Sequence, residues 1–196
     1  NPEAAASLNV LSTLTEKKLP LAIQQVVLAG LGEGLRRRGA SLQKLLADKA
    51  TSSEVRAQVN ELFSSALRFV RGSKSYRAEQ VAAVRLLAFA DLKMATEELP
   101  SFLTPQKPQP LQQAAVSAIA AQDSDVVAET LLAGWRTYSP QVRRDVVDGL
   151  ATKPARIKVL LAAVEAGSVK RGDIERSAKQ LLLKHPTADI RKRAME

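Results

Sequence analysis

The strongest constraint on this chain is a helical pattern that recurs at a nearly regular interval. Two stretches, "PLQQAAVSAIA" from Pro110 and "PQVRRDVVDGLA" from Pro140, superpose with an offset of 31 residues. Their aliphatic residues then coincide at helical spacing: Leu111 with Val142, Val116 with Val147 and Ile119 with Leu150. A period of this length predicts stacked helical pairs, in which each pair buries its apolar face only against its neighbours.

Two further stretches open in the same way and extend the pattern toward both ends of the chain. "EVRAQVNELF" carries Val55 and Arg56 at its start, and "DIRKRAME" carries Ile190 and Arg191. We interpret all four stretches as second helices of helical pairs. The first helices of such pairs include "SDVVAETLLAGWRTY" and "PARIKVLLAAVEAG", each with an apolar face. The sequence therefore predicts about ten helices and no strand.

Residues that favour helix ends fall between these stretches. Ser, Thr and Asp side chains accept hydrogen bonds from the first turn of a helix, and proline fits the first helical position. Glycine fits the position after the last turn. We therefore predict a capping box of Thr51 with Glu54, an N-cap at Asp123, first-turn prolines at Pro140 and Pro154, and a helix end at Gly167.

The composition fits closely packed helices better than a sandwich or barrel. Hydrophobic residues make up 45% of the 196 residues and aromatic residues only 4%, so Ala, Leu and Val must fill the core. We expect one repeat domain over residues 1–196, as a fragment of a larger protein. No apolar run approaches the ~18 residues of a membrane span, and no signal peptide is visible. Without cysteine there is no disulfide, thiolate nucleophile or cysteine metal site.

The stretch "VLAGLGEGLRRRG", Val27 to Gly39, raises the question of a phosphate-binding loop. Such a loop requires a strand before the glycines and a helix that starts after them. Neither is predicted, because helical spacing continues through the glycines and Gly39 suits a C-terminal cap. We expect Gly30 and Gly34 to share a packed face that a neighbouring helix approaches closely. That packing would offset the roughly 1 kcal/mol that a mid-helix glycine costs relative to alanine.

The Val-Arg openings resemble the second-helix signature of HEAT repeats, which are antiparallel helical pairs of roughly 40 residues. The resemblance implies an all-α fold, a HEAT-like or armadillo-like α-solenoid. The repeats are uneven, and the last carries the insertion "GSVKRGDIERSAKQLLLKH". A four-helix bundle or another compact helical array is therefore the alternative fold.

A more specific resemblance covers almost the whole chain. The stretches "GLGEGLRRRGASLQKLL", "LLAGWRTYSPQVRRDVVDGL" and "LLAAVEAGSVKRGDIERSAKQLLLKHPTADIRKRA" resemble the HEAT-like segment of large membrane-bound dehydrogenases with a PVC-type haem-binding region. In that family the segment lies between a propeller resembling sugar dehydrogenases and a C-terminal cytochrome c-like domain. The resemblance implies a protein of the periplasm or cell envelope in which this chain contacts those two domains.

The same resemblance implies no chemistry within this chain. Covalent c-type haem requires a Cys-x-x-Cys-His motif, so any haem would belong to a downstream domain of the parent protein. We expect a non-catalytic scaffold that spaces and docks neighbouring protein domains and holds no cofactor. An alternative is an enzyme fragment whose site is completed by segments outside the chain.

The polar residues that could carry chemistry have structural explanations. His185 is the only histidine, so no histidine cluster for a metal or a triad can form within the chain. We expect His185 to cap a helix end or to face solvent. Trp135, the only tryptophan, is predicted to pack in the core. Two acidic pairs are predicted on solvated helix faces: Asp145 with Asp148, and Glu97 with Glu98.

The net charge of +9 is the feature that a functional hypothesis must explain. Residues 151–196 hold 11 basic and 5 acidic residues, whereas residues 1–150 hold 18 and 15. The predicted interaction surface consists of seven basic residues: Arg143, Arg144, Lys170, Arg171, Arg191, Lys192 and Arg193. This surface suits an acidic protein domain.

A basic solenoid also allows a second hypothesis, in which the partner is nucleic acid. HEAT-like alkylpurine DNA glycosylases are the precedent, and they would make this chain a DNA-repair enzyme. However, few aromatic residues are available to stack on bases, because most lie at core-like spacings. Phosphate contacts alone give only salt-sensitive, nonspecific affinity. Nucleic acid is therefore the less favoured partner.

Overall fold

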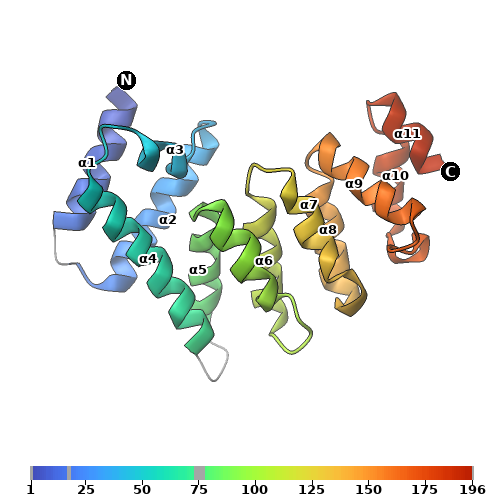
Figure 1. Ribbon diagram of the computed structural model, residues 1–196, viewed down its shortest axis with the longest axis horizontal. Helices are drawn as coiled ribbons and strands as arrows, with labels where there is room; N and C mark the ends of the chain where they lie inside the picture. Colours follow the sequence, from blue (N-terminus) through green and yellow to red (C-terminus); the bar gives the residue numbers. More distant parts are fainter. Residues whose placement is uncertain (1, 17–18, 73–77, 196) are drawn as a thin grey trace. The chain divides into compact units, whose positions relative to one another are not determined.

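The computed structural model describes residues 2–16, 19–72 and 78–195 (Figure 1). Helix makes up 77% of the described residues, and these residues contain no strand. The predicted all-helical class is therefore confirmed. The chain divides into two compact units, Asn1–Met94 and Ala95–Glu196. A single repeat domain over residues 1–196 stays a prediction.

The described part of the N-terminal unit contains five α-helices and one 3-10 turn. Their bounds are α1 (Pro2–Glu16), α2 (Leu21–Arg37), α3 (Leu42–Ala47), α4 (Ser53–Gly72), α5 (Ala78–Leu86) and η1 (Leu87–Phe89). The 20-residue α4 packs against α5, α2 and α1. The core of this unit is mostly aliphatic: Leu11, Leu14, Leu28, Leu35, Val59, Leu62, Phe63 and Val84.

Helix α2 runs without interruption through the glycines of "VLAGLGEGLRRRG". The prediction of a helix in place of a phosphate-binding loop is therefore confirmed. Arg36 and Arg37 lie in its last turn, where cations interact favourably with the negative end of the helix dipole. Gly39 follows the helix with a φ of 73°. The N–H of Ala40 donates to the carbonyl of Leu35 at 2.9 Å, as in a Schellman cap.

The packed glycine of α2 is Gly32, so the prediction for Gly30 and Gly34 is wrong. A Cβ atom on Gly32 would lie 2.5 Å from the ring of Phe89, so the missing side chain makes room for that ring. Beyond the helix itself, no atom of the described residues lies within 4 Å of a Cβ atom at Gly30 or Gly34. The reason is that α2 carries aliphatic residues on two faces, and spacing does not tell which face the core covers.

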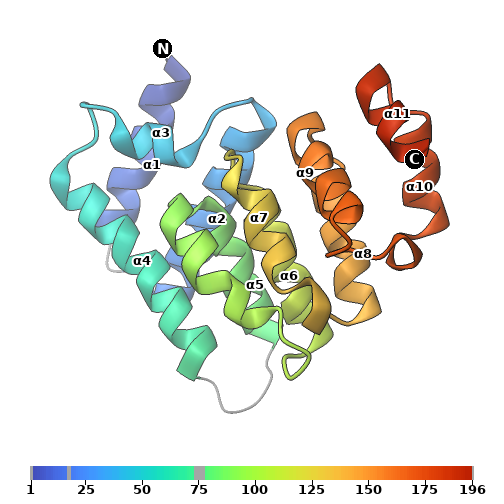
Figure 2. The same cartoon turned by 45° about the vertical axis from the view of Figure 1, so that its right-hand side comes forward.

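The described part of the C-terminal unit contains six α-helices joined by short turns (Figure 2). Their bounds are α6 (Gln109–Ala120), α7 (Val126–Ala133), α8 (Pro140–Leu150), α9 (Pro154–Glu165), α10 (Arg176–Leu183) and α11 (Ala188–Met195). The 3-10 turns are η3 (Leu99–Phe102), η4 (Trp135–Thr137) and η5 (Arg171–Asp173), and the π-helical turn η2 (Met94–Glu98) contains the boundary between the units. Helix α6 packs on α8, α7 packs on both α6 and α9, and α11 packs on α10 and α9.

The superposition of the two central stretches corresponds to equivalent buried positions in α6 and α8. All six aligned aliphatic residues are buried: Leu111, Val116, Ile119, Val142, Val147 and Leu150. Helix periodicity therefore identified the core-facing side of both helices correctly. Helix α8 buries one apolar face, whereas α6 is buried on most of its circumference, and the two helices pack against each other.

Three predicted helix ends are confirmed in the C-terminal unit. Pro140 and Pro154 are the first residues of α8 and α9, where the missing N–H of proline leaves no bond unmade. Gly167 follows the end of α9 with a φ of 73°, a left-handed conformation that glycine adopts without steric cost. Ser139 adds an N-cap, because its hydroxyl accepts from the N–H of Val142 at 3.3 Å.

Two predicted N-caps are wrong. Helix α4 is capped by Ser52, whose hydroxyl accepts from the N–H of Val55 at 3.3 Å. The hydroxyl of Thr51 instead donates to a carbonyl of α3 at 2.7 Å. Asp123 forms an ion pair with Lys153, and α7 begins at Val126 without a side-chain cap. In both cases a contact with another element competes with the local cap.

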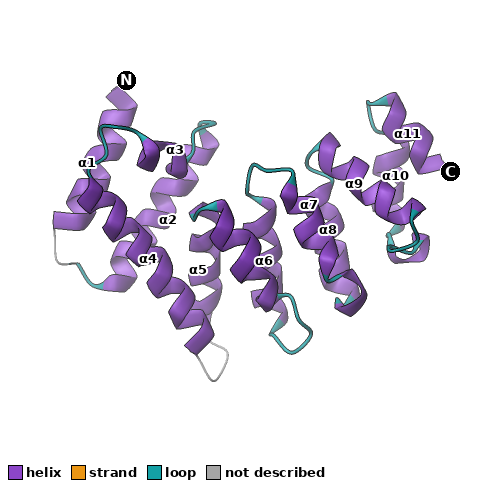
Figure 3. Ribbon diagram, viewed as in Figure 1, coloured by secondary structure: helices purple, strands orange, loops and turns teal. Residues whose placement is uncertain are grey.

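Figure 3 draws in teal the loops and turns that precede α4, α6, α8 and α11. In each of these four helices a long polar side chain near the start holds the turn before the helix. In each helix this polar residue directly follows an aliphatic residue: Val55, Leu111, Val142 or Ile190. The last three of these aliphatic residues are buried. Each side chain donates to backbone carbonyls five to eight residues earlier: Arg56 to Thr51 at 2.6 Å, Gln112 to Thr104 and Lys107 at 2.7 and 2.8 Å, Arg143 to Trp135 and Arg136 at 3.1 and 3.2 Å, and Arg191 to His185 and Pro186 at 2.7 and 2.8 Å. We call these four the turn-holding residues.

Candidate interaction surface

Arg143 connects the start of α8 to the η5 turn. Its guanidinium lies 5.5 Å from the centroid of the Trp135 ring and 3.0 Å from the carboxylate of Asp173. The indole N–H of Trp135 donates to the same carboxylate at 3.3 Å. Trp135 is buried, as predicted from its spacing. The cluster therefore fixes the inserted segment against α8, and the charge of Arg143 is already paired within the chain.

Arg144 and Arg193 form exposed ion pairs. The guanidinium of Arg144 lies 2.7 Å from Glu175. Arg193 donates to both carboxylate oxygens of Glu165, at 2.7 and 2.9 Å, which joins α11 to the end of α9. These hydrogen bonds from Arg193 hold the pKa of Glu165 below its usual value. Arg144 and Arg193 thus have acidic partners in the same unit.

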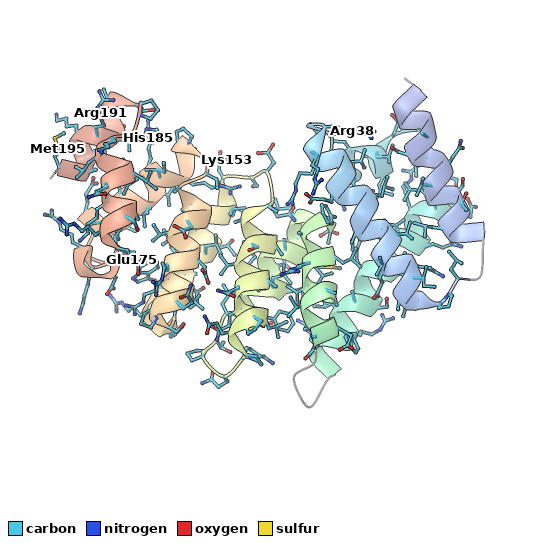
Figure 4. The ribbon with its side chains drawn as sticks, turned by 180° about the vertical axis from the view of Figure 1, so that it is seen from behind. Arg38, Lys153, Glu175, His185, Arg191 and Met195 are labelled. Carbon is cyan, nitrogen blue, oxygen red and sulfur yellow. The ribbon has the colours of Figure 1, made fainter. Side chains whose placement is uncertain are left out.

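Arg191 and His185 order the turn between α10 and α11, where Figure 4 labels both residues. Arg191 donates to the carbonyls of His185 and Pro186. The Nδ1 atom of His185 accepts from the N–H of Thr187 at 3.1 Å, just before α11 begins. His185 thus stabilises the turn before α11, and its side chain is half-buried.

Three of the predicted surface cations have no ion-pair partner in the part of the chain that the structure describes. They are Lys170, Arg171 and Lys192. Lys170 and Arg171 belong to the η5 turn and its approach, whereas Lys192 lies on α11. The seven predicted residues therefore divide into four with partners inside the chain and three that are available for contact with another molecule.

An apolar groove of about 200 Å³ lies among α9, η5, α10 and α11. Its lining is mostly aliphatic: Leu161, Val164, Ile174, Leu182, Leu183, Ala194 and Met195. Glu165 and Arg193 also line the groove and pair with each other, whereas Arg171 and Lys179 give it a cationic border. Leu183 and Met195 are 38% and 71% exposed, so this apolar surface is open to solvent. The sequence did not predict this groove, because its residues come from four elements.

A second, more polar groove of about 360 Å³ lies between α6 and α8. Asp145 and Asp148 of α8 line it. Asp148 is exposed, as predicted, but Asp145 is half-buried. One carboxylate oxygen of Asp145 accepts from Gln141 at 3.0 Å, and the other is buried without a hydrogen-bond partner. Loss of solvent, together with the charges of Asp145 and Glu175, raises the pKa of Asp148.

Arg156 is a buried cation that the sequence pattern does not reveal. It is 1% exposed and donates from α9 to the carbonyls of Ala120, at 2.7 Å, and Gln122. These carbonyls lie at the end of α6, where the negative end of the helix dipole stabilises a cation. Burial nevertheless lowers the pKa of Arg156. The nearby ion pair of Lys153 with Asp123 is a second link between α9 and the turn after α6.

The arrangement offers binding surface: an open apolar groove bordered by cations, a polar groove, and three available cations. Within the described residues, no group of three or more His, Cys, Asp or Glu side chains could hold a metal ion. None of the described helices is long and apolar enough to cross a lipid bilayer. In comparisons with known proteins, no family model, curated protein or solved structure matches the chain.

Proposed function

We propose that the chain is a non-catalytic HEAT-like scaffold that spaces and docks neighbouring protein domains. The observation that carries this proposal is the recurrence of the turn-holding residues at the start of four helices. One structural unit repeated along a chain requires the same contact at the same position of each unit. An unrelated set of helices has no reason to place it there.

The interval between longer-range contacts in the C-terminal unit supports an α-solenoid. Four side-chain contacts span 28 to 38 residues, close to the 31-residue offset of the sequence repeat: Lys153 with Asp123, Arg156 with Ala120, Arg193 with Glu165, and Trp135 with Asp173. Such contacts connect each helical pair to the next along the chain, as solenoid architecture requires. In the alternative compact bundle, helical pairs that are not neighbours along the chain would be in contact as well.

The groove of α9 to α11 supports a docking role. Exposed apolar surface bordered by polar residues is typical of protein interaction sites. Lys170 directly precedes η5, and Lys192 lies in α11, next to the cationic border of the groove in the sequence. These cations suit a partner with acidic residues around an apolar centre. We extend the proposal to the parent protein, an envelope dehydrogenase in which a propeller and a cytochrome c-like domain are the docked partners. Any haem would belong to that cytochrome domain.

The nucleic-acid hypothesis has less support from the geometry. Phosphate binding at useful affinity requires several cations that neutralise phosphates together. Four of the seven predicted cations already donate to carbonyls or carboxylates of the chain. Lys170, Arg171 and Lys192 are the three that remain.

The reading frame on both sides of the chain provides a first test of the proposed function. We expect a propeller pattern before residue 1 and a Cys-x-x-Cys-His motif after residue 196. The chain and each flanking domain would then be purified separately and mixed, and lysine cross-links would be mapped by mass spectrometry. Cross-links from Lys170 or Lys192 to a flanking domain support docking. Leu183→Glu with Met195→Glu should abolish these cross-links, and Val126→Glu, at an exposed aliphatic residue outside the groove, is the control. The absence of association at the highest soluble concentration refutes the proposal.

A further inference from the structure

Helix α2 carries a second apolar face that the described residues of its own unit leave exposed. Ile23, Val26 and Val27 are 47%, 69% and 36% exposed. Gly30 and Gly34 continue this face at helical spacing, with open space above both. We call these five residues the α2 outer face. The core lies under other positions of the helix: Leu28, Gly32 and Leu35.

No described atom outside α2 packs against the two glycines of the α2 outer face. Glycine is the least favourable residue in a helix interior apart from proline. At Gly32 the ring of Phe89 fills the space that the missing side chain leaves. Gly30 and Gly34 have no such neighbour among the described residues; Gly30 is exposed and Gly34 is half-buried. Bare backbone of this kind allows another chain to approach closely.

Charge at the end of α2 indicates the chemistry of the partner. Arg36 and Arg37 lie in the last turn and both pair with Glu33. Arg38, labelled in Figure 4, is exposed and has no ion-pair partner among the described residues. Three cations against one carboxylate leave a positive end beside the apolar face. A partner that covers this face therefore gains from acidic residues at that end.

We propose that the α2 outer face docks one amphipathic helix of a partner protein, antiparallel to α2 and with an acidic first turn. In this orientation the first turn of the partner lies beside Arg38. Acidic residues in the first turn stabilise a helix, just as basic residues in the last turn do. The dipoles of two antiparallel helices also attract each other. The inference rests on the proposed docking function and identifies a surface in the N-terminal unit with the chemistry of its partner.

A second copy of this chain does not fit the same surface. Helix α2 has no acidic residue in its first turn, so an antiparallel pair of α2 helices would bring the arginines beside no carboxylate. A parallel pair would bring arginines beside arginines, and like charges oppose association. A lipid surface is also a poor match, because membrane-surface helices use bulky Trp, Phe and Leu, whereas this face ends in two glycines.

The inference can be tested with a phage-displayed library of 17-residue helices, the length of α2, selected on the whole chain. The library keeps one stripe of Leu and Ala fixed and randomises the first and last turns. We expect selected helices to carry Asp or Glu in the first turn. Their affinity as free peptides is then measured by fluorescence anisotropy. Enrichment of acidic residues in the last turn, or of basic residues in the first, would overturn the proposed orientation.

Four variants locate the binding site of the selected peptides. Gly30→Leu should weaken binding at least tenfold, because a branched side chain occupies the point of closest approach. Val26→Asp should do the same, whereas Leu21→Asp, at another exposed position of α2 that lies off this face, is the matched control. Arg38→Glu should weaken acidic peptides and strengthen peptides with a basic first turn. Equal binding to all variants contradicts the inference.

Controls separate this inference from the proposed function. Gly30→Leu should leave the melting temperature unchanged or higher, since its Cβ meets open space, and a lower value means that the chain itself covers the face. Peptides that bind through Leu183 and Met195 instead would leave the scaffold function intact and refute α2 docking. Dimerisation, or binding to anionic vesicles, that Val26→Asp abolishes would assign the face to a second copy or to a lipid surface.

Discussion

Alanine substitution at three glycines of one helix should give opposite changes in stability. At Gly32 the new Cβ atom would lie 2.5, 2.6 and 2.9 Å from three atoms of the Phe89 ring. The ring has little freedom to move, because Gln43 donates to the carbonyl of Phe89 at 2.8 Å and the guanidinium of Arg36 lies 5.5 Å from the ring centroid. Overpacking of this kind costs about 1–3 kcal/mol.

Gly30→Ala and Gly34→Ala are the matched controls. Their Cβ atoms meet open space, so each should gain the helix propensity of alanine, about 0.8–1 kcal/mol in the free energy of unfolding. Gly32→Ala has the same gain in propensity. The difference between Gly32→Ala and either control therefore isolates the overpacking, about 1–3 kcal/mol.

Urea unfolding followed by far-UV circular dichroism provides the measurement, with the denaturant midpoint compared at constant slope. Equal stability of Gly32→Ala and Gly30→Ala would refute the packing of Phe89 on α2. Destabilisation by Gly30→Ala or Gly34→Ala would show that the α2 outer face is covered within the chain.

The remaining predictions concern charge. Arg156→Leu should lower the free energy of unfolding by about 2–4 kcal/mol, because two buried carbonyls lose charge-assisted hydrogen bonds, and Arg156→Lys should cost less in the same denaturation assay. Asp148→Asn should raise the melting temperature at neutral pH, since a raised pKa marks an anion less stable in the folded chain; the gain should fade as pH falls toward about 4 and Asp148 is protonated. Duplex DNA should bind no tighter than about 1 μM at ~0.15 M salt. The scaffold hypothesis is contradicted by a dissociation constant below about 1 μM if the triple variant Lys170→Ala, Arg171→Ala, Lys192→Ala abolishes the binding. Base release from alkylated duplex would contradict it too.

The helical class and the core of α6 and α8 could be predicted from the sequence. Helix α8 has one apolar face and α6 is apolar on most of its circumference, so spacing places Leu111 and Val142 in the core without a choice between two faces. The proline and glycine signals were equally reliable at Pro140, Pro154 and Gly167, because they act through the backbone of their own residue.

Helix α2 could not be predicted to the same depth. Two of its faces are apolar, and the choice between them depends on where Phe89 and α4 lie. The N-cap of α4 failed for a similar reason, since Thr51 and Ser52 are both suitable and only the contact with α3 distinguishes them. Local patterns list the possible contacts, and tertiary packing selects among them.

The sequence predicted which basic residues belong to the candidate surface, but not which of them form ion pairs within the chain. The basic residues are evident in the sequence, but Arg193 finds Glu165 across 28 residues and Arg143 finds Asp173 in a different element. Arg156 looks like one more cation of a solvated helix, and its burial depends on the end of α6, 34 to 36 residues earlier. Only the arrangement of the helices determines which cations remain available.

The turn-holding residues also influence how the chain folds. Each closes a loop of five to eight residues, and short loops lose little entropy on closure. In the proposed solenoid, the contacts of Lys153 with Asp123 and of Arg156 with Ala120 connect successive pairs, close loops of about one repeat and depend on pairs that are already ordered. During synthesis, therefore, we expect each pair to order soon after it leaves the ribosome and to act as the template on which the next pair folds.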